Sequence, residues 1–483
     1  MNQKILNLVT QFSSYVGFKL ISHVFREYDI RGIYDSELTS KFAFHLGRTF
    51  GIFLQNRGDV CVGRDVRKGG QLLQDAFVNG LLDTGCNVTT IGQVPIGISN
   101  FAIWEGKFTA GVYITASHNP PEYNGFRFRH SDGTGFIEEN EKIRDIFFDH
   151  RTVDTSIRQS GRLRLKKTED VIESYWSLIS KTYQRLGQLK IGVDAGNGGA
   201  SKVAGDIFEK AGHQTTRIND LPDDNYPNRS PHNKDSEISE LKSMVTREGC
   251  DFGIAFDGDG DRCVFVDDEG RSCKTEKILI VLAKQMRTTR EKKVVVSVPC
   301  STILESELEP LGIKVIRCKV GDVHVSEAMK KHNAMLGGEV SSHVFVPDFY
   351  FFDDSILTTL KLSESLLKSG SRLSSLMDEI QDLPYEQIFV PCPDNVKFKI
   401  VDLVAGHFSH TNAEISRLDG IRVLDNKGWV LVRGSNTEPL IKVIVEGKDI
   451  ESFSKKKEEI LDLLESEMKA FDLSLQTMDA KNA

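Results

Sequence analysis

The sequence lacks the cysteine patterns and the long apolar runs that mark several classes of protein. Its 8 cysteines form no Cys-x-x-Cys pair, so neither a zinc cage nor a disulfide framework is expected. No apolar run approaches about 18 residues, so no transmembrane helix is predicted. Gln11, Ser13 and Ser14 interrupt any apolar stretch near the N-terminus, which argues against a signal peptide. We therefore expect a cytoplasmic protein without a membrane partner.

The chain also lacks an excess of positive charge. Its formal net charge of −8 argues against a nucleic-acid partner, because nucleic-acid-binding surfaces are basic. Hydrophobic residues at 39% and charged residues at 27% are ordinary for a globular protein. A chain of 483 residues is too long for one core, and its length suggests roughly three or four domains. The oligomeric state stays open between a monomer and a small homo-oligomer.

Short apolar strands alternate with helices through most of the chain. A helix at 40–56, a strand at 60–62 and a helix at 72–84 begin the series, which restarts near residues 168 and 276. This alternation predicts βαβ units and largely parallel sheets. The tail differs: its predicted strands are 396–400, 420–424, 428–433 and 440–446, and its predicted helices lie near 401–409 and 450–471. The predicted fold class is α/β, with three similar mixed α/β domains and a C-terminal α+β domain.

One predicted strand ends in a proline-containing turn that carries a serine. Residues 111–115 form an apolar run, and Pro120 and Pro121 cannot continue a sheet because proline lacks an N–H donor. Ser117, with His118 beside it, is therefore held at the end of a rigid strand, where a nucleophilic hydroxyl could act. A serine that merely caps a turn is the alternative, and the rest of the chain decides between the two.

Three aspartates alternate with glycines directly after the predicted strand 252–256. In an extended run Asp257, Asp259 and Asp261 point to one side, and their charges repel one another unless a cation lies between them. Their oxygen ligands select Mg²⁺ or Ca²⁺. An EF-hand is excluded, because Arg262 stands where that loop requires glycine. A solvated acidic turn is the alternative; the pattern favours a metal site.

Two polar loops follow later predicted strands. Glu339, Ser341 and His343 lie on the first, where a carboxylate and a hydroxyl suit the hydroxyl groups of a sugar. The second combines a guanidinium, two hydroxyls, an amide and backbone N–H groups, which suits a phosphate monoester. Its residues are Arg433, Ser435, Asn436 and Thr437. An ordinary polar loop and an ordinary turn are the alternatives.

Two further turns follow predicted strands. Gly63–Arg67 ends a strand at the position where α/β proteins place ligand loops. Ala195–Gly199 comes nearest to a dinucleotide-binding fingerprint, but Ser201 occupies the place of the third glycine. We interpret this second segment as a tight turn followed by a helix.

Taken together and in order, these motifs resemble those of the α-D-phosphohexomutase superfamily, and most of all its bacterial phosphomannomutase/phosphoglucomutase branch. The matching segments are Tyr28–Gly32, Thr115–Gly125, Ala255–Arg262, Gly338–His343 and Arg433–Pro439. The resemblance implies four domains around a central active-site cleft. The predicted divisions are an N-terminal extension (1–23), a phosphoserine-bearing α/β domain (24–165), a metal-binding α/β domain (166–272), a sugar-recognition α/β domain (273–386) and a C-terminal phosphate-binding α+β domain (387–483).

The resemblance implies a mutase that moves a phosphoryl group between O1 and O6 of a hexose phosphate, of mannose and/or glucose, through a hexose 1,6-bisphosphate. Phosphorylated Ser117 would donate this group and would bind Mg²⁺ together with Asp257, Asp259 and Asp261. The other implied catalytic residues are His118, Arg31, Arg127, Arg262 and His343. The implied substrate-binding residues are Tyr28, Lys319, Glu339, Ser341, Arg433, Ser435, Asn436 and Thr437.

The sequence departs from the family pattern at two positions. Arg127 stands where the branch usually has a lysine with a proposed role in proton transfer. Arginine stays protonated and is a poor base, so we expect His343 or His118 to act as the acid/base. Ser342 stands where glycine is usual and is expected to narrow the pocket slightly.

Three alternatives to a mannose or glucose mutase are open. One is a phosphoglucosamine mutase, since the sequence does not distinguish among these sugars. Another is a sugar-phosphate phosphatase that uses the same serine; the Arg433 loop argues against it, because a hydrolase needs no grip on a second phosphate. The third is a sensor without catalysis, which the intact Ser117 and the three aspartates disfavour.

Overall fold

The computed structural model describes residues 21–149, 160–184, 187–286, 289–408, 413–435 and 438–479. The described residues fall into two compact units. The first unit consists of the chain up to Thr275 together with Ser341–Met377, and the second consists of Glu276–Val340 together with the chain from Asp378 onward. Most of the predicted N-terminal extension, residues 1–20, lies outside the described part. The boundaries of the four domains stay predictions.

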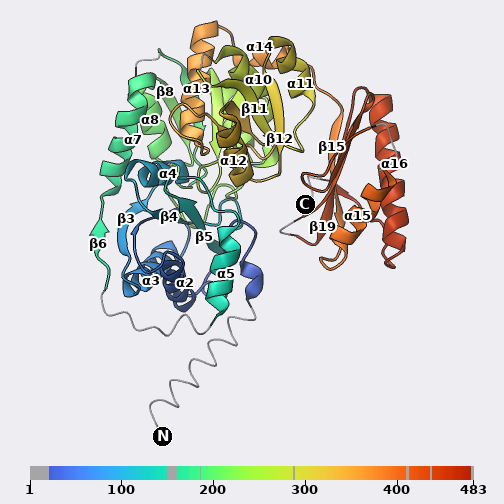
Figure 1. The fold of residues 1–483 in the computed structure, drawn as a ribbon. Coiled ribbons are helices and arrows are strands. Elements are labelled where there is room, and N and C mark those ends of the chain that lie inside the picture. Colours follow the sequence, from blue (N-terminus) through green and yellow to red (C-terminus); the bar gives the residue numbers. More distant parts are fainter. Residues whose placement is uncertain are drawn as a thin grey trace. The chain divides into compact units, whose positions relative to one another are not determined.

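The first unit begins with a mixed sheet (Figure 1). Its strands are β1 (Ile30–Ile33), β2 (Asp59–Arg64), β3 (Asn87–Gln93), β4 (Ala110–Ile114), β5 (Tyr123–His130) and β6 (Leu163–Leu165), in the order β1-β5-β4-β2-β3-β6. The pairs of β2 with β3, β2 with β4 and β3 with β6 are parallel, whereas β5 is antiparallel to both β1 and β4. The helices are η1 (Ser22–Val24), α2 (Ser40–Phe53), α3 (Gly70–Asp83), α4 (Ile96–Glu105), α5 (Glu139–Phe148) and α7 (Thr168–Tyr183).

Aromatic side chains fill the core between this sheet and helices α2 and α3. The ring of Phe50 on α2 lies 6.2 Å from that of Phe77 on α3 and 4.6 Å from that of Phe128 on β5, measured between centroids. All three side chains are buried. The core holds the sheet rigid, so the loops at its strand ends have a fixed base.

A second sheet in the same unit has the strand order β10-β9-β7-β8. Its strands are β7 (Lys190–Asp194), β8 (Gln214–Ile218), β9 (Phe252–Phe256) and β10 (Cys263–Asp267), and its helices are α8 (Val203–Lys210), η2 (Asp235–Glu237) and α9 (Ser239–Glu248). Strands β9 and β10 are antiparallel neighbours, so the aspartate-rich loop between them is a short hairpin connection. The unit also contains β14 (Val344–Phe345), α13 (Ser355–Ser369) and α14 (Leu373–Asp378).

The second unit contains parallel strands in the order β12-β11-β13 and an antiparallel C-terminal sheet in the order β16-β17-β18-β19-β15-β20. The first group comprises β11 (Glu291–Ser297), β12 (Lys314–Cys318), β13 (Ala334–Gly338), α10 (Thr275–Gln285), α11 (Ile303–Leu308), η3 (Glu309–Leu311) and α12 (Asp322–His332). The C-terminal group comprises β15 (Tyr385–Pro391), β16 (Glu414–Ser416), β17 (Ile421–Asp425), β18 (Gly428–Gly434), β19 (Leu440–Gly447), β20 (Met478–Asp479), α15 (Lys397–His407) and α16 (Ile450–Lys469).

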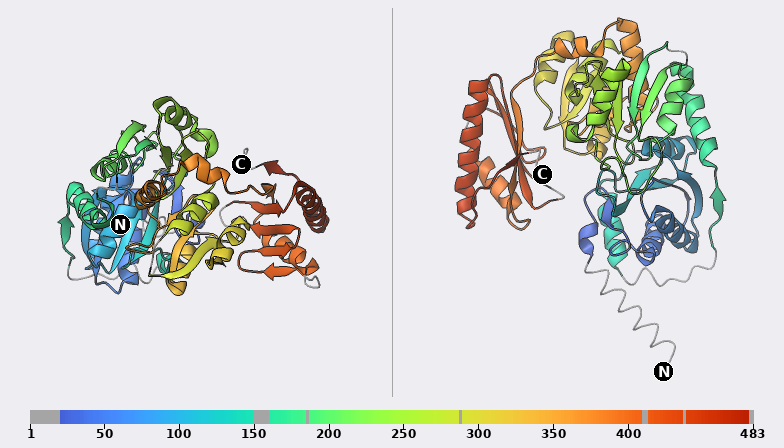
Figure 2. Two further views of the ribbon diagram at one scale, coloured as in Figure 1. Left: turned by 90° about the horizontal axis from the view of Figure 1, so that it is seen from above. Right: turned by 180° about the vertical axis from the view of Figure 1, so that it is seen from behind.

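Helices α15 and α16 cover one face of the C-terminal sheet (Figure 2). The opposite face carries Trp429, Leu431 and Ile444, which pack with Val298 near the end of β11. The predicted fold class is therefore confirmed: three mixed α/β domains and a C-terminal domain built on an antiparallel sheet.

The predicted strand at 396–400 is wrong, because these residues begin helix α15. The alternation of Val396, Phe398 and Ile400 suggested a strand, but Phe398 is 52% exposed whereas Lys397 is buried. The Lys397 ammonium donates to Asp394 Oδ1 at 2.6 Å and to the carbonyl of Glu438 at 2.9 Å. The alternation therefore does not separate a buried face from a solvent face. The strand of this region is β15, which lies earlier in the chain.

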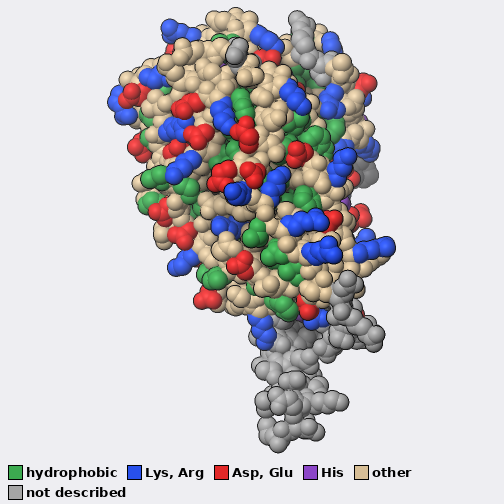
Figure 3. Space-filling model, turned by 90° about the vertical axis from the view of Figure 1, so that its left-hand side faces the viewer, with side chains coloured by type: hydrophobic (Ala, Val, Ile, Leu, Met, Phe, Trp, Pro, Cys, Tyr) green, Lys and Arg blue, Asp and Glu red, His purple; other side chains and the backbone are tan. Residues whose placement is uncertain are grey.

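No helix among the described residues is long and apolar enough to cross a membrane. Basic and acidic side chains are interspersed on the face drawn in Figure 3.

Candidate active site

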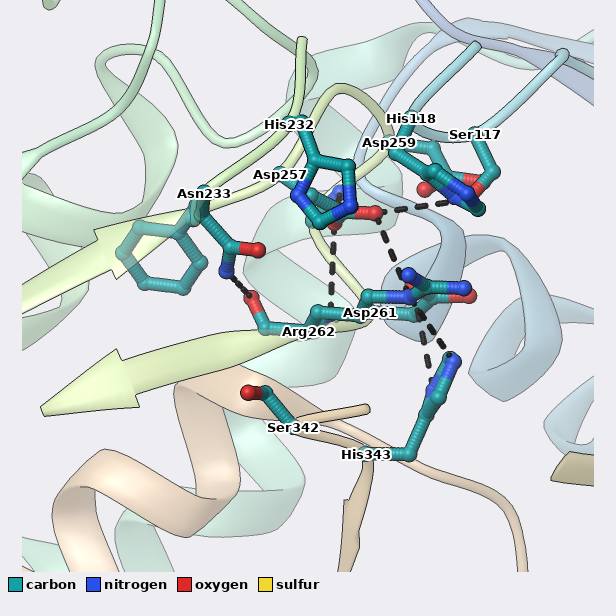
Figure 4. Close-up of polar contacts among 12 residues, drawn as sticks. Ser117, His118, His232, Asn233, Asp257, Asp259, Asp261, Arg262, Ser342 and His343 are labelled. Atoms are coloured by element: carbon teal, nitrogen blue, oxygen red, sulfur yellow. Dashed lines mark hydrogen bonds and ion pairs between the residues drawn. The ribbon is translucent and has the colours of Figure 1, made fainter. Parts of the chain in front are cut away.

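Ser117 lies at the end of β4 with its side chain directed at the aspartate-rich loop (Figure 4). Its Oγ donates a hydrogen bond to Asp257 Oδ2 at 3.3 Å and lies 3.2 Å from His118 Nδ1. The residue is buried and has a φ of 52°, a left-handed conformation that is unfavourable for a residue with a side chain. The turn predicted from the prolines therefore places the hydroxyl against the predicted metal ligands.

The three aspartates lie together in the loop between β9 and β10. All three are fully buried, and one ligand oxygen from each lies within 4.8 Å of the others. The loop approaches the serine closely at Gly258, where a Cβ atom would lie 2.5 Å from the carbonyl oxygen of Ser117. Glycine is required there because any side chain would push the two loops apart.

The charges of this cluster are not balanced by protein cations alone. Burial, and then the charge of Asp261, raise the pKa of Asp257 to about 6. Burial and both neighbouring aspartates raise the pKa of Asp259 well above its usual value. Asp259 Oδ1 is buried and has no hydrogen-bond partner among the described residues. A cation such as Mg²⁺ fits these hard oxygen ligands, because they repel one another and Asp259 Oδ1 has no hydrogen-bond partner among the described residues.

Three arginines surround the serine and the aspartates. Arg127 on β5 donates to Asp261 Oδ2 at 2.8 Å and lies 3.8 Å from Asp259 Oδ2. The backbone N–H of Arg262 donates to Asp257 Oδ1 at 3.2 Å. Arg31 on β1 donates to the carbonyl of Ala116 at 3.1 Å and to Asn119 Oδ1 at 2.6 Å, on the two sides of Ser117. The cluster thus brings positive charge close to the serine hydroxyl.

His343 is held between Asp353 and Arg262. Its Nδ1 lies 2.6 Å from Asp353 Oδ2, and its Nε2 accepts a hydrogen bond from Arg262 Nε at 3.0 Å. Burial lowers the pKa of His343, but Asp261 and Asp353 outweigh burial and raise it to about 9. Nε2 accepts from Arg262 only while the ring is neutral, whereas the raised pKa favours the protonated ring. The raised pKa reflects the bare charge of Asp261, which a bound cation would reduce.

A second histidine, His232, lies beside His118. Their rings meet edge to face with centroids 4.9 Å apart. Burial, and then Arg262, lower the pKa of His118 well below its usual value and lower that of His232 to about 3. Both rings are therefore neutral near neutral pH. His118 Nδ1 thus lies beside the Ser117 hydroxyl without adding a positive charge next to the proposed metal ligands.

The second unit gathers another part of the predicted site around Asp419. Its Oδ1 accepts from Arg433 Nε at 3.0 Å, and its Oδ2 accepts from the backbone N–H of Val320 at 3.2 Å. Glu339 is buried, and its Oε1 accepts from the backbone N–H of Gly321 at 2.8 Å. The loop that carries the exposed Lys319 is thus tied to both Arg433 and Glu339.

Sequence models of one family match the chain in four consecutive segments. The phosphoglucomutase/phosphomannomutase α/β/α domain I matches residues 22–154, domain II matches 170–270, domain III matches 274–383 and the C-terminal domain matches 388–463. The chain belongs to this family. It is therefore an enzyme of the phosphohexomutase class, an isomerase of carbohydrate metabolism.

Individual relatives of this family carry different sugar names. The chain is 36% identical over 423 residues to the probable phosphoglucosamine mutase of Methanothermobacter thermautotrophicus, with 87% of this chain and 92% of the relative covered. It is 34% identical over 456 residues to the phosphoglucomutase/phosphomannomutase of Thermococcus kodakarensis, with 92% and 99% covered. The X-ray structure of a phosphoglucomutase/phosphomannomutase family protein from Burkholderia thailandensis superposes with a TM-score of 0.84 at 27% identity, over 92% of this chain and 98% of that chain. Membership establishes the class of reaction and leaves the sugar open.

The remaining predicted substrate-binding residues of this family member differ in burial, and two of them lie outside the described part of the chain. Tyr28 is half-buried in the bend that precedes β1, and Ser341 is half-buried in the loop before His343. Ser435 is buried, and its backbone N–H donates to the carbonyl of Leu440. Asn436 and Thr437 lie outside the described residues.

Ser342 has a φ of 72°, so a serine occupies a left-handed position that glycine adopts without strain. The left-handed backbone at this position explains why glycine is usual there in the family pattern.

Sequence reasoning missed several partners of the functional residues. They are Asp65, Arg67, Thr115, His232, Asp353 and Asp419. Asp65 and Arg67 lie in the Gly63–Arg67 turn, which the sequence had singled out, whereas Asp353 lies ten residues after His343 and outside the segments named. His232 carried no signal because it is 114 positions from His118, whose ring it contacts, and Asp419, 14 positions from Arg433, lies in no segment that the sequence had singled out.

Proposed function

We propose that the protein is a phosphohexomutase that moves a phosphoryl group reversibly between O1 and O6 of a hexose phosphate, of mannose and/or glucose. The observation that carries this proposal is the Ser117 hydroxyl, which is buried against Asp257 at 3.3 Å inside a cluster of three carboxylates. A hydroxyl used only as a turn cap would not need such a charged and desolvated environment.

In the proposed reaction, phosphorylated Ser117 transfers its phosphoryl group to the free hydroxyl of the bound sugar phosphate, which loses its proton. The product is a hexose 1,6-bisphosphate and an unmodified Ser117. After the sugar has turned around, Ser117 Oγ takes the other phosphoryl group and the isomeric monophosphate leaves. Asp257, Asp259, Asp261 and the phosphoserine oxygen would hold Mg²⁺, which neutralises charge on the transferred group.

The surrounding residues have separate roles in this proposal. Arg31 and Arg262 contribute positive charge at the transferred group, and Arg127 holds Asp261 in place by its 2.8 Å contact. His118 Nδ1, 3.2 Å from Ser117 Oγ, is placed to accept the proton when Ser117 acts as the nucleophile. His343 is the candidate for proton exchange with the sugar hydroxyl; this role requires Arg262 to leave Nε2.

Substrate recognition falls to residues of the polar loops. Arg433, Ser435, Asn436 and Thr437 would grip the phosphate that does not react, and Lys319 and Tyr28 would complete the substrate contacts. Glu339 and Ser341 would bind the sugar hydroxyls in either orientation. We further propose a cytoplasmic enzyme that acts on small hexose phosphates as a monomer or a small homo-oligomer.

A phosphoglucosamine mutase is the second candidate, because the relative from Methanothermobacter thermautotrophicus carries that name. A coupled assay with mannose, glucose and glucosamine 1-phosphates, each with and without its 1,6-bisphosphate, separates the candidates. Activation by the bisphosphate and turnover of the mannose or glucose ester support the proposal. Turnover of the glucosamine ester alone would assign the second candidate, and release of inorganic phosphate in place of isomerisation would indicate a phosphatase.

A further inference from the structure

Ser117 needs support from its surroundings, because its left-handed backbone is held against a local preference. The loop that follows it, up to Tyr123, is also irregular and lies between β4 and β5. Four backbone carbonyl groups of this segment accept hydrogen bonds from one common partner, the side chain of Arg67. This side chain is fully buried.

The guanidinium of Arg67 collects four carbonyl oxygens of the serine loop. It donates to those of Ser117 at 2.5 Å, Asn119 at 2.6 Å, Pro120 at 2.7 Å and Tyr123 at 3.0 Å. A planar group with five N–H donors is suited to such a set of acceptors, whereas an ammonium has three donors and no fixed plane.

Asp65 and Thr115 connect this clamp to the catalytic centre. Asp65 Oδ2 lies 3.3 Å from Arg67 Nε and accepts from the Thr115 hydroxyl at 2.6 Å. The same hydroxyl oxygen accepts from the backbone N–H of Ser117 at 2.7 Å and lies 3.2 Å from Asp259 Oδ2. Displacement of Arg67 would therefore alter both the conformation and the position of Ser117.

Arg229 makes a smaller set of contacts beside the aspartate-rich loop, one of them with the residue that directly precedes this loop. Its Nε donates to Asp194 Oδ2 at 2.8 Å, and its two terminal nitrogens donate to the carbonyls of Phe256 at 2.6 Å, His232 at 3.0 Å and Ser230 at 3.2 Å. Phe256 directly precedes the ligand Asp257. A Cβ atom at Gly196 would lie 2.5 Å from an Arg229 nitrogen, so the turn after β7 must approach this side chain closely.

We propose that Arg67 and Arg229 are positioning residues for phosphoryl transfer, each fixing one of the two loops that meet at the reacting atoms. Arg67 fixes the serine and Arg229 fixes the metal ligands. The inference deepens the proposed mutase function and rests on it. Because the two clamps act on different loops, their loss has different consequences. A shift of the serine displaces the reacting oxygen and one of the four proposed metal ligands, whereas a shift of the aspartates displaces the other three ligands.

The test uses Arg67→Lys and Arg229→Lys in the full chain, with the exposed Arg57→Lys as the control. Steady-state assays measure kcat and the Mg²⁺ concentration for half-maximal activity. Arg67→Lys is expected to lower kcat at saturating Mg²⁺ by roughly tenfold to a hundredfold, as misplacement of a reacting group does. Its Mg²⁺ requirement should change less than that of Arg229→Lys, because only one of the four proposed ligands is displaced. Arg229→Lys should raise the Mg²⁺ requirement by roughly tenfold or more, as loss of a residue supporting metal ligands does. The proposal would be overturned if the two variants changed kcat and the Mg²⁺ requirement to the same extent. It would also be overturned if neither variant changed either quantity.

Two further measurements keep the inference separate from protein folding and from the function on which it rests. If Arg67→Lys does not fold, Thr115→Val removes the connecting hydroxyl and Thr115→Ser retains it; only the valine variant should lose kcat. Intact mass reports phosphorylation of Ser117 by glucose 1,6-bisphosphate without any mutase assay. A parent protein that is phosphorylated but does not isomerise sugars contradicts the proposed function. Arg67→Lys that is phosphorylated as fast as the parent contradicts the clamp.

Discussion

The two units differ in how many protein groups contact their buried charged side chains. In the first unit, the three aspartates are fully buried and are contacted by groups from several strands and loops, among them Arg127, Arg262 and Ser117. In the second unit, Arg433 is paired with Asp419 through Nε, its one ion-pair partner among the described residues. The first arrangement fixes geometry and the second leaves donors for a ligand.

We therefore assign phosphoryl transfer to the first region and binding of the non-reacting phosphate to the second. A phosphoryl group moves only when the nucleophile and the stabilising charges stand at set distances, so the reacting centre is built from residues with little freedom. A phosphate that is merely held accepts hydrogen bonds from several directions, and a guanidinium on a strand end suffices. Substitutions in the first region should therefore change rates, and those in the second should change affinities.

The largest effect is expected for Ser117→Ala, which removes the proposed phosphoryl carrier. Mutase activity should fall to the background of the assay, because the variant lacks the hydroxyl that donates to Asp257 Oδ2. Intact mass of freshly purified parent protein should show a partial addition of one phosphate that is absent from the variant. A Ser117→Ala protein with undiminished activity would place the chemistry elsewhere.

Asp259→Asn comes next and tests the metal cluster. Loss of one charged ligand should lower kcat by about a hundredfold or more, since metal stabilisation of transferring charge is worth several kcal/mol. The same substitution removes part of the repulsion among the aspartates, so it should raise the Tm of the metal-free protein at pH 8. The surface variant Asp83→Asn is the control, and full activity in EDTA would contradict the metal assignment.

The same cluster predicts how the stabilisation by Mg²⁺ depends on pH. Raised carboxyl pKa values mean that the folded protein favours the protonated forms. For Asp257, the metal-free protein should lose stability as the pH rises from the unfolded value of about 4 to the folded value of about 6. Mg²⁺ binds the deprotonated carboxylates, so its addition should raise Tm more at pH 8 than at pH 5. Equal shifts at both pH values would show that these aspartates are not the ligands.

Arg433→Ala should raise KM with little effect on the phosphorylation of Ser117. A charge-assisted contact of this kind is worth roughly 1.5–3 kcal/mol, about tenfold to a hundredfold in affinity. The increase should be similar for every hexose phosphate, because a phosphate grip does not distinguish sugars. Arg417→Ala, an exposed arginine of the same domain, is the matched control. A change confined to one sugar would assign Arg433 to sugar recognition.

The smallest effect is expected for Glu339→Ala. This side chain would contact both sugars through hydroxyl groups, so the difference between them should change by about 1 kcal/mol, roughly fivefold in the ratio of kcat/KM values. The measurement is kcat/KM for the mannose and glucose esters side by side. An unchanged ranking, with both values lowered equally, would indicate that Glu339 only holds the Gly321 turn.

The chemistry-bearing loops could be predicted because each lies within a short stretch of sequence. Three aspartates spaced by glycines repel one another, which predicts a cation between them. A serine that a proline-containing turn holds at a strand end predicts a nucleophile in a fixed position. The partners of these loops could not be predicted in this way. The four carbonyl contacts of Arg67 and the ring contact of His232 with His118 join residues that lie 50 or more positions apart.

The sequence by itself determined the family, the class of fold and the identity of the reacting groups. Local patterns suffice for these, except where an alternation such as 396–400 does not separate a buried from an exposed face. Tertiary structure alone decided the left-handed backbone of Ser117, the contacts of His343 with Asp353 and Arg262, and the residues that hold each loop. These depend on which groups meet after folding, because hydrogen bonding and burial act through space and not along the chain.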